Sequence, residues 1–129
     1  MIRIELGNLP PKELSPNYNR KAHWWHRARA QQWWRELVYI SALEARIKAR
    51  PKGYLPYKKV KLTWTFVYRM NRKRDVDNLI AACKTAQDCL VLAGLIEADD
   101  SEHLKLGETR IIVDKNQLSQ AIIEIEEDI

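Results

Sequence analysis

With 129 residues and a formal net charge of +5, the chain is long enough to bury one core, and we expect a single domain over residues 1–129. Its hydrophobic fraction of 46% and charged fraction of 30% are typical of globular proteins. No apolar run approaches the roughly 20 residues that a membrane-spanning helix needs. Because the first residues also lack the apolar core of a signal peptide, a cytoplasmic location is expected.

The charges are divided unevenly along the chain. Residues 1–74 hold 18 Lys and Arg against 4 Asp and Glu, whereas residues 75–129 hold 4 against 13. This asymmetry indicates a surface that binds a polyanion beside a cluster of carboxylates. Two plainer interpretations remain: both faces are merely solvated, or two chains pair a basic face with an acidic one.

The first half of the chain predicts a strand, a loop and a long helix. Residues 1–6 alternate, with Ile2, Ile4 and Leu6 on one face. Residues 15–20 are rich in turn formers and could contact phosphates, although a plain connector fits equally well. A helical period then runs over residues 21–49, and Arg50-Pro51-Lys52-Gly53 ends it.

The apolar residues of this helix predict which side enters the core. The expected core face comprises Ala22, Trp33, Leu37, Ile40 and Ile47, with Trp25 and Leu43 at its margin. The helix also contains the adjacent pairs Trp24–Trp25 and Trp33–Trp34, and one member of each pair should be peripheral. Such indoles could stack on bases or pack across a dimer interface, but core packing with edge cover is the plainer interpretation. His23 and His26 are spaced for a metal but lack a third ligand nearby.

Residues 60–70 alternate more clearly than any other segment, which predicts a long strand at the centre of the sheet. A basic run, Arg72-Lys73-Arg74, follows it directly. A second helix is expected from Asp77 or Asn78 to Ala93, stopped by Gly94. Its apolar stripe is predicted to be Leu79, Cys83, Ala86, Leu90 and Ala93.

Two further strands, over residues 108–113 and 120–126, follow a loop that contains Asp99, Asp100 and Ser101. The order β-α-β-α-β-β predicts an α+β domain with one mixed sheet and two main helices. The second helix should carry Asp77, Lys84 and Asp88 along one polar face, with Lys84 and Asp88 spaced to form an ion pair.

Asp75-Val76-Asp77 is the centre of the functional interpretation. In an extended segment, side chains at i and i+2 point to the same side, so the two carboxylates should converge. Convergent carboxylates repel unless a cation lies between them, and Mg²⁺ is the usual occupant. A solvated turn with helix-capping acids is the plainer explanation of an isolated D-x-D.

The run from Arg74 to Ser101, RDVDNLIAACKTAQDCLVLAGLIEADDS, resembles the RusA family of Holliday junction resolvases, found in phages and prophages. The shared pattern is D-x-D-N-L, a lysine, an aspartate one turn later, an A-G step and a D-D-S loop. The resemblance covers about a quarter of the chain strongly. In the founding member the lysine comes one turn closer to the D-x-D, where this chain has Ala81.

The resemblance implies a homodimeric, Mg²⁺-dependent endonuclease that cuts four-way junctions and other branched DNA by paired nicks, with Mn²⁺ as an alternative ion. It assigns metal binding and catalysis to Asp75, Asp77 and Asp100, and a catalytic cation to Lys84. Asn78, Asp88 and Asp99 would support them. The expected DNA contacts are Asn17, Arg20, Lys21, Arg27, Arg69, Arg72, Lys73 and Arg74.

Two other classes of function remain open from the sequence. A non-catalytic DNA-binding or architectural module would use the basic helix and its tryptophans, but it gains nothing from carboxylates that repel phosphate. A protein-interaction domain with complementary charged faces would bind no DNA at moderate salt.

Overall fold

The computed structural model describes residues 1–14, 24–49, 55–71 and 76–128, except for the side chains of residues 76–78. Its elements are strand β1 (Ile2–Glu5), a 3-10 turn η1 (Lys12–Leu14), helix α1 (Trp24–Ala49), strand β2 (Val60–Tyr68), helix α2 (Val76–Leu92), and strands β3 (Leu104–Val113) and β4 (Gln120–Glu127). This is the α+β domain expected from the sequence, with two main helices and the expected order of elements.

The four strands form one mixed sheet in the order β1-β4-β2-β3. The centrally predicted strand, β2, does lie inside the sheet, antiparallel to β4 and parallel to β3. Because β2 and β3 are parallel, the chain must cross over between them, and α2 is that crossover. Strands β3 and β4 follow each other in sequence but are not neighbours, since β2 lies between them.

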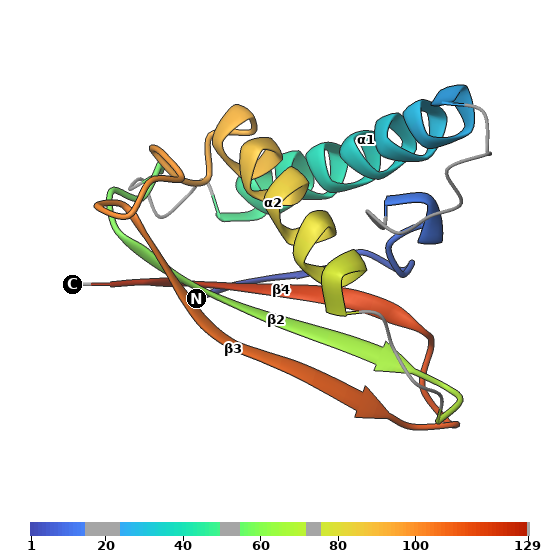
Figure 1. Cartoon of the computed structure of the whole chain (residues 1–129). Coiled ribbons are helices and arrows are strands. Elements are labelled where there is room, and N and C mark those ends of the chain that lie inside the picture. The colour runs from blue at the N-terminus through green and yellow to red at the C-terminus, as the bar shows by residue number, and fades with distance from the viewer. Residues whose placement is uncertain (15–23, 50–54, 72–75, 129) are drawn as a thin grey trace.

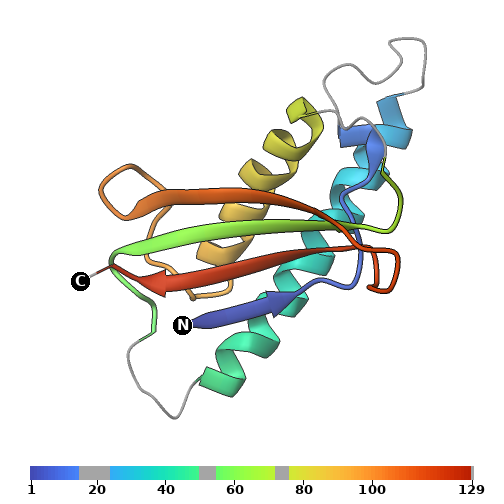
Figure 2. The same ribbon diagram turned by 90° about the horizontal axis from the view of Figure 1, so that it is seen from below.

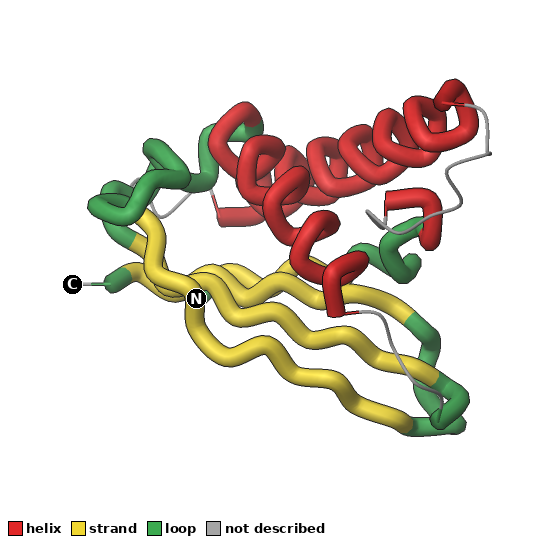
Figure 3. Tube along the Cα trace, viewed as in Figure 1, coloured by secondary structure: helices red, strands yellow, loops and turns green. Residues whose placement is uncertain are grey.

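Both helices cover the same face of the sheet, which gives two layers (Figures 1 and 3). Figure 2 shows α2 crossing behind β2 and β3, and α1 behind β4 and β1. The core lies between the layers, where alternate residues of β2 point toward the helices: Val60, Leu62, Trp64 and Phe66 are each at most 2% exposed.

The buried face of α1 differs from the predicted one. The residues that enter the core are Trp34, Val38 and Ala42, whereas Trp33, Ile40 and Ile47 are 45%, 55% and 66% exposed. Leu37 of the predicted face packs partly buried against the core, but the centre of the buried side lies roughly 140° around the helix from the predicted centre. Helix α1 is apolar on two sides, and the side with Val38 at its centre packs inward. There the buried indole Nε1 of Trp34 donates to the carbonyl oxygen of Ala82 in α2, at 3.1 Å.

The predicted stripe of α2 is confirmed. Leu79, Ala86, Leu90 and Ala93 are buried, and Cys83 is half-buried against the core. Gly94 ends the helix with a φ of +80°, a left-handed conformation that suits glycine. Strand β3 begins four residues earlier than predicted, because a bulge opposite Leu62–Trp64, at Gly107 and Glu108, interrupts its alternation. No helix in the described part of the chain is long and apolar enough to cross a membrane.

Candidate functional site

Helix α2 has predicted site residues at both of its ends. Asp77 is its second residue, so the D-x-D segment leads directly into the helix. Asp75 and the basic run Arg72-Lys73-Arg74 lie outside the described residues, as do the side chains of Asp77 and Asn78. At the other end, Gly94 starts the loop that carries Asp99 and Asp100 toward β3.

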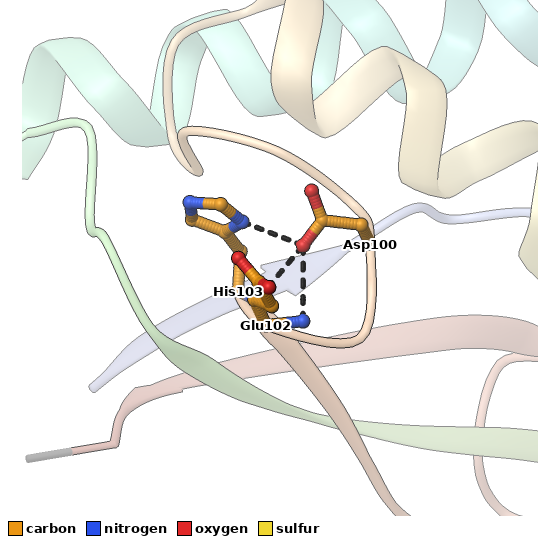
Figure 4. A network of polar contacts seen from close by, with 3 residues as sticks. All are labelled: Asp100, Glu102 and His103. Carbon is orange, nitrogen blue, oxygen red and sulfur yellow. Dashed lines mark hydrogen bonds and ion pairs between the residues drawn. The ribbon is translucent and has the colours of Figure 1, made fainter.

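Asp100 is held by the turn that follows it. Its Oδ1 accepts hydrogen bonds from the backbone N–H of Glu102 at 3.0 Å and of His103 at 3.2 Å. The same oxygen lies 2.6 Å from Nδ1 of His103. Figure 4 shows the three residues gathered in this turn, and one ligand atom from each lies within 4.8 Å of the others. An imidazole nitrogen and carboxylate oxygens at such spacing are donors that suit a divalent cation.

Asp100 and His103 stabilise each other's charged forms. The hydrogen bond from His103, supported by the two backbone N–H groups, lowers the pKa of the Asp100 carboxyl below its ordinary value. The same bond, with the nearby charges of Glu97 and Glu102, raises the pKa of His103. An ionised Asp100 is therefore maintained, which is the state that a metal ligand requires.

Asp88 contacts Asp99, not Lys84. The interaction with the Asp99 carboxyl raises the pKa of Asp88, burial adds to this, and the charge of Arg35 in α1 opposes it. Among the described residues no ion pair joins Lys84 to Asp88, although their spacing predicts one. Of the predicted polar face, Lys84 and Asp88 are exposed and the side chain of Asp77 lies outside the described residues, and Asp88 is near the loop that contains Asp99.

Lys84 is exposed near the middle of α2 and borders a groove between this helix and strand β3. The groove has a volume of about 450 Å³ and is mainly apolar, with walls that include Ile80, Cys83, Leu106 and Ile111. Burial raises the pKa of Cys83 to about 12, so its thiol stays protonated. The indole N–H of Trp64, which also lines the groove, is buried and has no hydrogen-bond partner in the part of the chain that the structure describes.

The helix separates the carboxylates that the sequence groups together. Helix α2 has 17 residues, which at 1.5 Å per residue makes it about 25 Å long. Asp77 lies in the first turn of this helix and Asp100 in the loop after its end, and the start of α2 and that loop lie toward opposite ends of the molecule (Figure 1). Within one chain, the fold does not bring Asp77 and Asp100 into one site.

Only two of the expected DNA contacts fall in the described part of the chain. Arg27, near the start of α1, and Arg69, just after β2, are both exposed. These two element ends lie toward the same end of the molecule as the start of α2, as Figures 1 and 2 agree. The predictions for Asn17, Arg20 and Lys21 lie outside the described residues. His23 does too, and His26 stacks on Trp25 with ring centroids 3.8 Å apart.

Glu102 and His103 were not predicted from the sequence. A signal for them was present, because Asp100, Glu102 and His103 are spaced i, i+2, i+3 in a short segment before a strand, where one turn can gather them. Comparisons with protein-family models, curated proteins and solved structures found no match for the chain.

Proposed function

We propose that the chain is a metal-dependent, structure-specific endodeoxyribonuclease of the RusA type that resolves four-way junctions and related branched DNA. The observation that carries the proposal is the RusA-like run from Arg74 to Ser101, which folds around a single helix with carboxylates at both ends. A basic segment, Arg72-Lys73-Arg74, precedes this helix, so a polyanion would be attracted to the D-x-D segment at the start of α2. The proposed setting is the cytoplasm of a bacterium, with a phage-derived gene.

The donor set fits Mg²⁺. Asp100 is exposed and held ionised, and its Oδ1 receives the three bonds of the turn. The residues that would hold the metal are Asp75, Asp77 and Asp100, with Glu102 and His103 next to Asp100. Bound there, Mg²⁺ would lower the pKa of the attacking water and stabilise charge on the phosphate oxygens. Mn²⁺ could replace it, because His103 adds a nitrogen donor.

Two copies of the chain are needed to complete this donor set. Because α2, about 25 Å long, lies between Asp77 and the loop that carries Asp100, the D-x-D segment of one copy would have to meet the Asp100 turn of another. A homodimer with two-fold symmetry would form two such sites, one for each of two opposed strands. The proposal therefore joins the expected dimer to the expected chemistry.

The remaining residues would bind and orient the DNA. Arg72, Lys73 and Arg74 would contact phosphates beside the cleaved bond, and Arg27 and Arg69 would extend that basic track. Lys84 would place a cation near the reacting phosphate, with Asn78 bracing the D-x-D turn. Asp88 and Asp99 would support the site from beside the loop that carries Asp100.

The test uses a synthetic four-way junction and a linear duplex of the same sequence, with and without Mg²⁺, and maps the nicks on each strand. Paired nicks on opposed strands of the junction, present only with metal, are expected. Asp77→Asn should abolish cleavage without weakening junction binding in EDTA. Asp128→Asn, an exposed acid after β4, is the control with the same charge change and should cleave like the parent.

Cleavage by Asp77→Asn at the parental rate would contradict the proposed function. Metal-independent binding with no cleavage by the parent protein would instead support a DNA-binding module without catalysis. Binding should also weaken steeply as salt rises, because phosphate contacts release counterions.

A further inference from the structure

The outward side of α1 carries Trp25, Arg29 and Trp33 at four-residue intervals, and we name these three residues the tryptophan row. At 100° per residue, the centre of the row lies about 180° around the helix from Val38, the centre of the buried side. Trp25 and Trp33 are 38% and 45% exposed. Core packing accounts for Trp34 but not for these two indoles, and aromatic surface so exposed marks an interaction site.

Two neighbours hold the indole of Trp25 in place. His26 stacks on it with ring centroids 3.8 Å apart, and the guanidinium of Arg29 lies over the same ring, 4.9 Å from its centroid. A guanidinium stacked on an indole keeps its charge and its N–H donors for an anion. The tryptophan row therefore alternates aromatic surface with a positioned cation.

The charges along α1 favour an anionic partner for the half of the helix that contains the row. Residues 24–35 include Arg27, Arg29 and Arg35 but no Asp or Glu, whereas residues 36–49 balance two Lys or Arg against two Glu. A polyanion is therefore attracted to the first half of α1 and not to the second.

A single strand of DNA supplies both complements of the row. Its unpaired bases have open faces that stack on indoles, and its phosphates accept hydrogen bonds from guanidinium groups. In a duplex each base is covered by its stacked neighbours, so the row would meet phosphates but no open base face. At 1.5 Å per residue the row spans about 12 Å from Trp25 to Trp33, against about 3.4 Å between stacked bases of one strand. It can thus contact several nucleotides.

We propose that the tryptophan row binds unpaired bases of DNA, which stack on Trp33 and Trp25 while Arg29 contacts a phosphate between them. The inference rests on the proposed function for DNA as the partner. It adds the feature by which the chain distinguishes a branched substrate from a plain duplex. The start of α1 and the start of α2 lie toward the same end of the molecule (Figures 1 and 2). A strand unpaired at a branch point would be held at the end where the D-x-D segment leads into α2.

The test measures binding of a labelled oligothymidylate of about 16 nucleotides and of a duplex of equal length, by fluorescence anisotropy of the full chain in EDTA. Trp33→Ala should weaken single-strand binding on the order of 10-fold, because one stacked base is lost, and should change duplex binding by less than about 2-fold. Trp33→Phe, which keeps an aromatic face, should restore most of the affinity. Trp33→Leu, which is apolar but has no such face, should bind like Trp33→Ala.

The salt dependence separates the roles of the indole and the guanidinium. Trp33→Ala should leave the slope of log affinity against log salt unchanged, because it removes no phosphate contact. Arg29→Gln should reduce the steepness of that slope on the single strand by about 0.7, the value for one phosphate contact. The control is Ile47→Ala, which lies on the same outward side of α1 beyond the row and is 66% exposed. It should bind both DNAs like the parent.

The inference is overturned if Trp33→Ala binds the single strand like the parent, or if Trp33→Leu restores the affinity as well as Trp33→Phe does. Equal losses in Trp33→Ala and Ile47→Ala would also overturn it, because a protein contact along the whole outward side of α1 would then govern binding. A chain that loses single-strand affinity as expected but cleaves no junction would contradict the proposed function and leave the tryptophan row standing. Junction cleavage with no effect of Trp33→Ala on binding would do the reverse.

Discussion

The carboxyl group of Asp100 has its charge fixed by neighbours within its own turn. Three donors converge on one of its oxygens, and the imidazole of His103 is the strongest influence on its pKa. The Asp100 side chain is exposed and that of His103 partly exposed, so solvent screens the interaction and its contribution to folding is small. Its effect on titration, however, can be measured for a single residue.

Replacing Asp100 by Asn should return the pKa of His103 toward 6.5, the ordinary value from which the carboxylate raises it. The ion pair is complete where both groups are charged. It weakens as the pH rises through the elevated pKa of His103, and again as the pH falls through the lowered pKa of Asp100. An NMR titration of the His103 ring in metal-free protein measures this. Asp99→Asn is the control, and an equal shift in both variants would contradict the assigned contact.

Asp88 and Asp99 make an unfavourable contact at neutral pH, and Asp88→Asn should relieve it. The folded-state pKa of Asp88 is raised above the ordinary 3.8, so the protonated contact favours folding below about that pH, and the favourable effect is lost as the pH rises through the elevated value. Asp88→Asn should thus stabilise the fold at pH 7, by less than about 1 kcal/mol because the site is exposed. Thermal melts at pH 7 and pH 3.5 test this; the gain should vanish at pH 3.5. Asp128→Asn, at an exposed position, should show no comparable gain.

At the scale of elements, the end of α2 is fixed to α1 by one side chain. Nη1 of Arg46 in α1 donates to the carbonyl oxygen of Ala93 at 3.2 Å, which satisfies a carbonyl in the last turn of α2. The same guanidinium packs against Gly94, where a Cβ would lie 2.5 Å from Nη1. The turn after α2 leads on to Asp99 and Asp100, so this contact also positions the loop that carries them.

Gly94→Ala should destabilise the protein more than Gly7→Ala does. Both glycines have a left-handed φ, +80° and +72°, so alanine costs about 1–2 kcal/mol at either position. Only at Gly94 does the new methyl group also displace Arg46, which should add about 1 kcal/mol for the lost hydrogen bond. Nothing lies within 4 Å of a Cβ at Gly7, so that variant is the matched control. Urea unfolding measures both, and equal losses would contradict the role of Arg46.

The periodicity of β2 and α2 was sufficient to predict their position and their buried faces. Each has one continuous apolar side, and burying that side leaves one solution. The buried face of α1 was harder to predict. Trp33 and Trp34 are adjacent and both faces of the helix carry aliphatic residues, so the helical period alone could not identify the face that enters the core. The choice depends on Ala82 in α2, whose carbonyl accepts the Trp34 indole N–H 48 positions away along the chain.

The candidate site was predictable in its residue types but not in its arrangement. The D-x-D, Lys84 and the D-D-S loop were recognised as a family pattern along the chain. The predicted helix to Ala93 already implied a long separation between its two ends, but the pattern grouped the carboxylates as one site. Likewise, Asp88 is four residues from Lys84 on one helix face, yet it contacts Asp99. The loop after Gly94 turns back toward the helix, and the spacing of residues along α2 does not predict the path of that loop.

At the scale of the whole molecule, the two described arginines expected to contact DNA and the acidic loop after α2 lie toward different ends. The start of α1, which carries Arg27, and the end of β2, just before Arg69, lie toward the end of the molecule where α2 starts (Figure 1). Asp88 belongs to the last turns of α2, and Asp99 and Asp100 to the loop that follows it at the other end. A single chain thus presents cations near one half of the proposed donor set and carboxylates at the other. The proposed two-fold homodimer would bring the D-x-D end of each copy to the acidic loop of the other.

Mixing two inactive variants should restore cleavage if each site is shared between copies. Asp77→Asn retains Asp100, and Asp100→Asn retains Asp75 and Asp77, so a mixed dimer has one site with all three carboxylates and one with neither Asp77 nor Asp100. With random pairing, half of the dimers are mixed and each has one complete site, which gives about a quarter of the parental sites. Cleavage should return to about that level and consist of single nicks. The matched control mixes Asp77→Asn with the double variant Asp77→Asn/Asp100→Asn, which can form no complete site. If neither mixture cleaves the junction, Asp77 and Asp100 do not act together in one shared site, even if the chain forms a dimer.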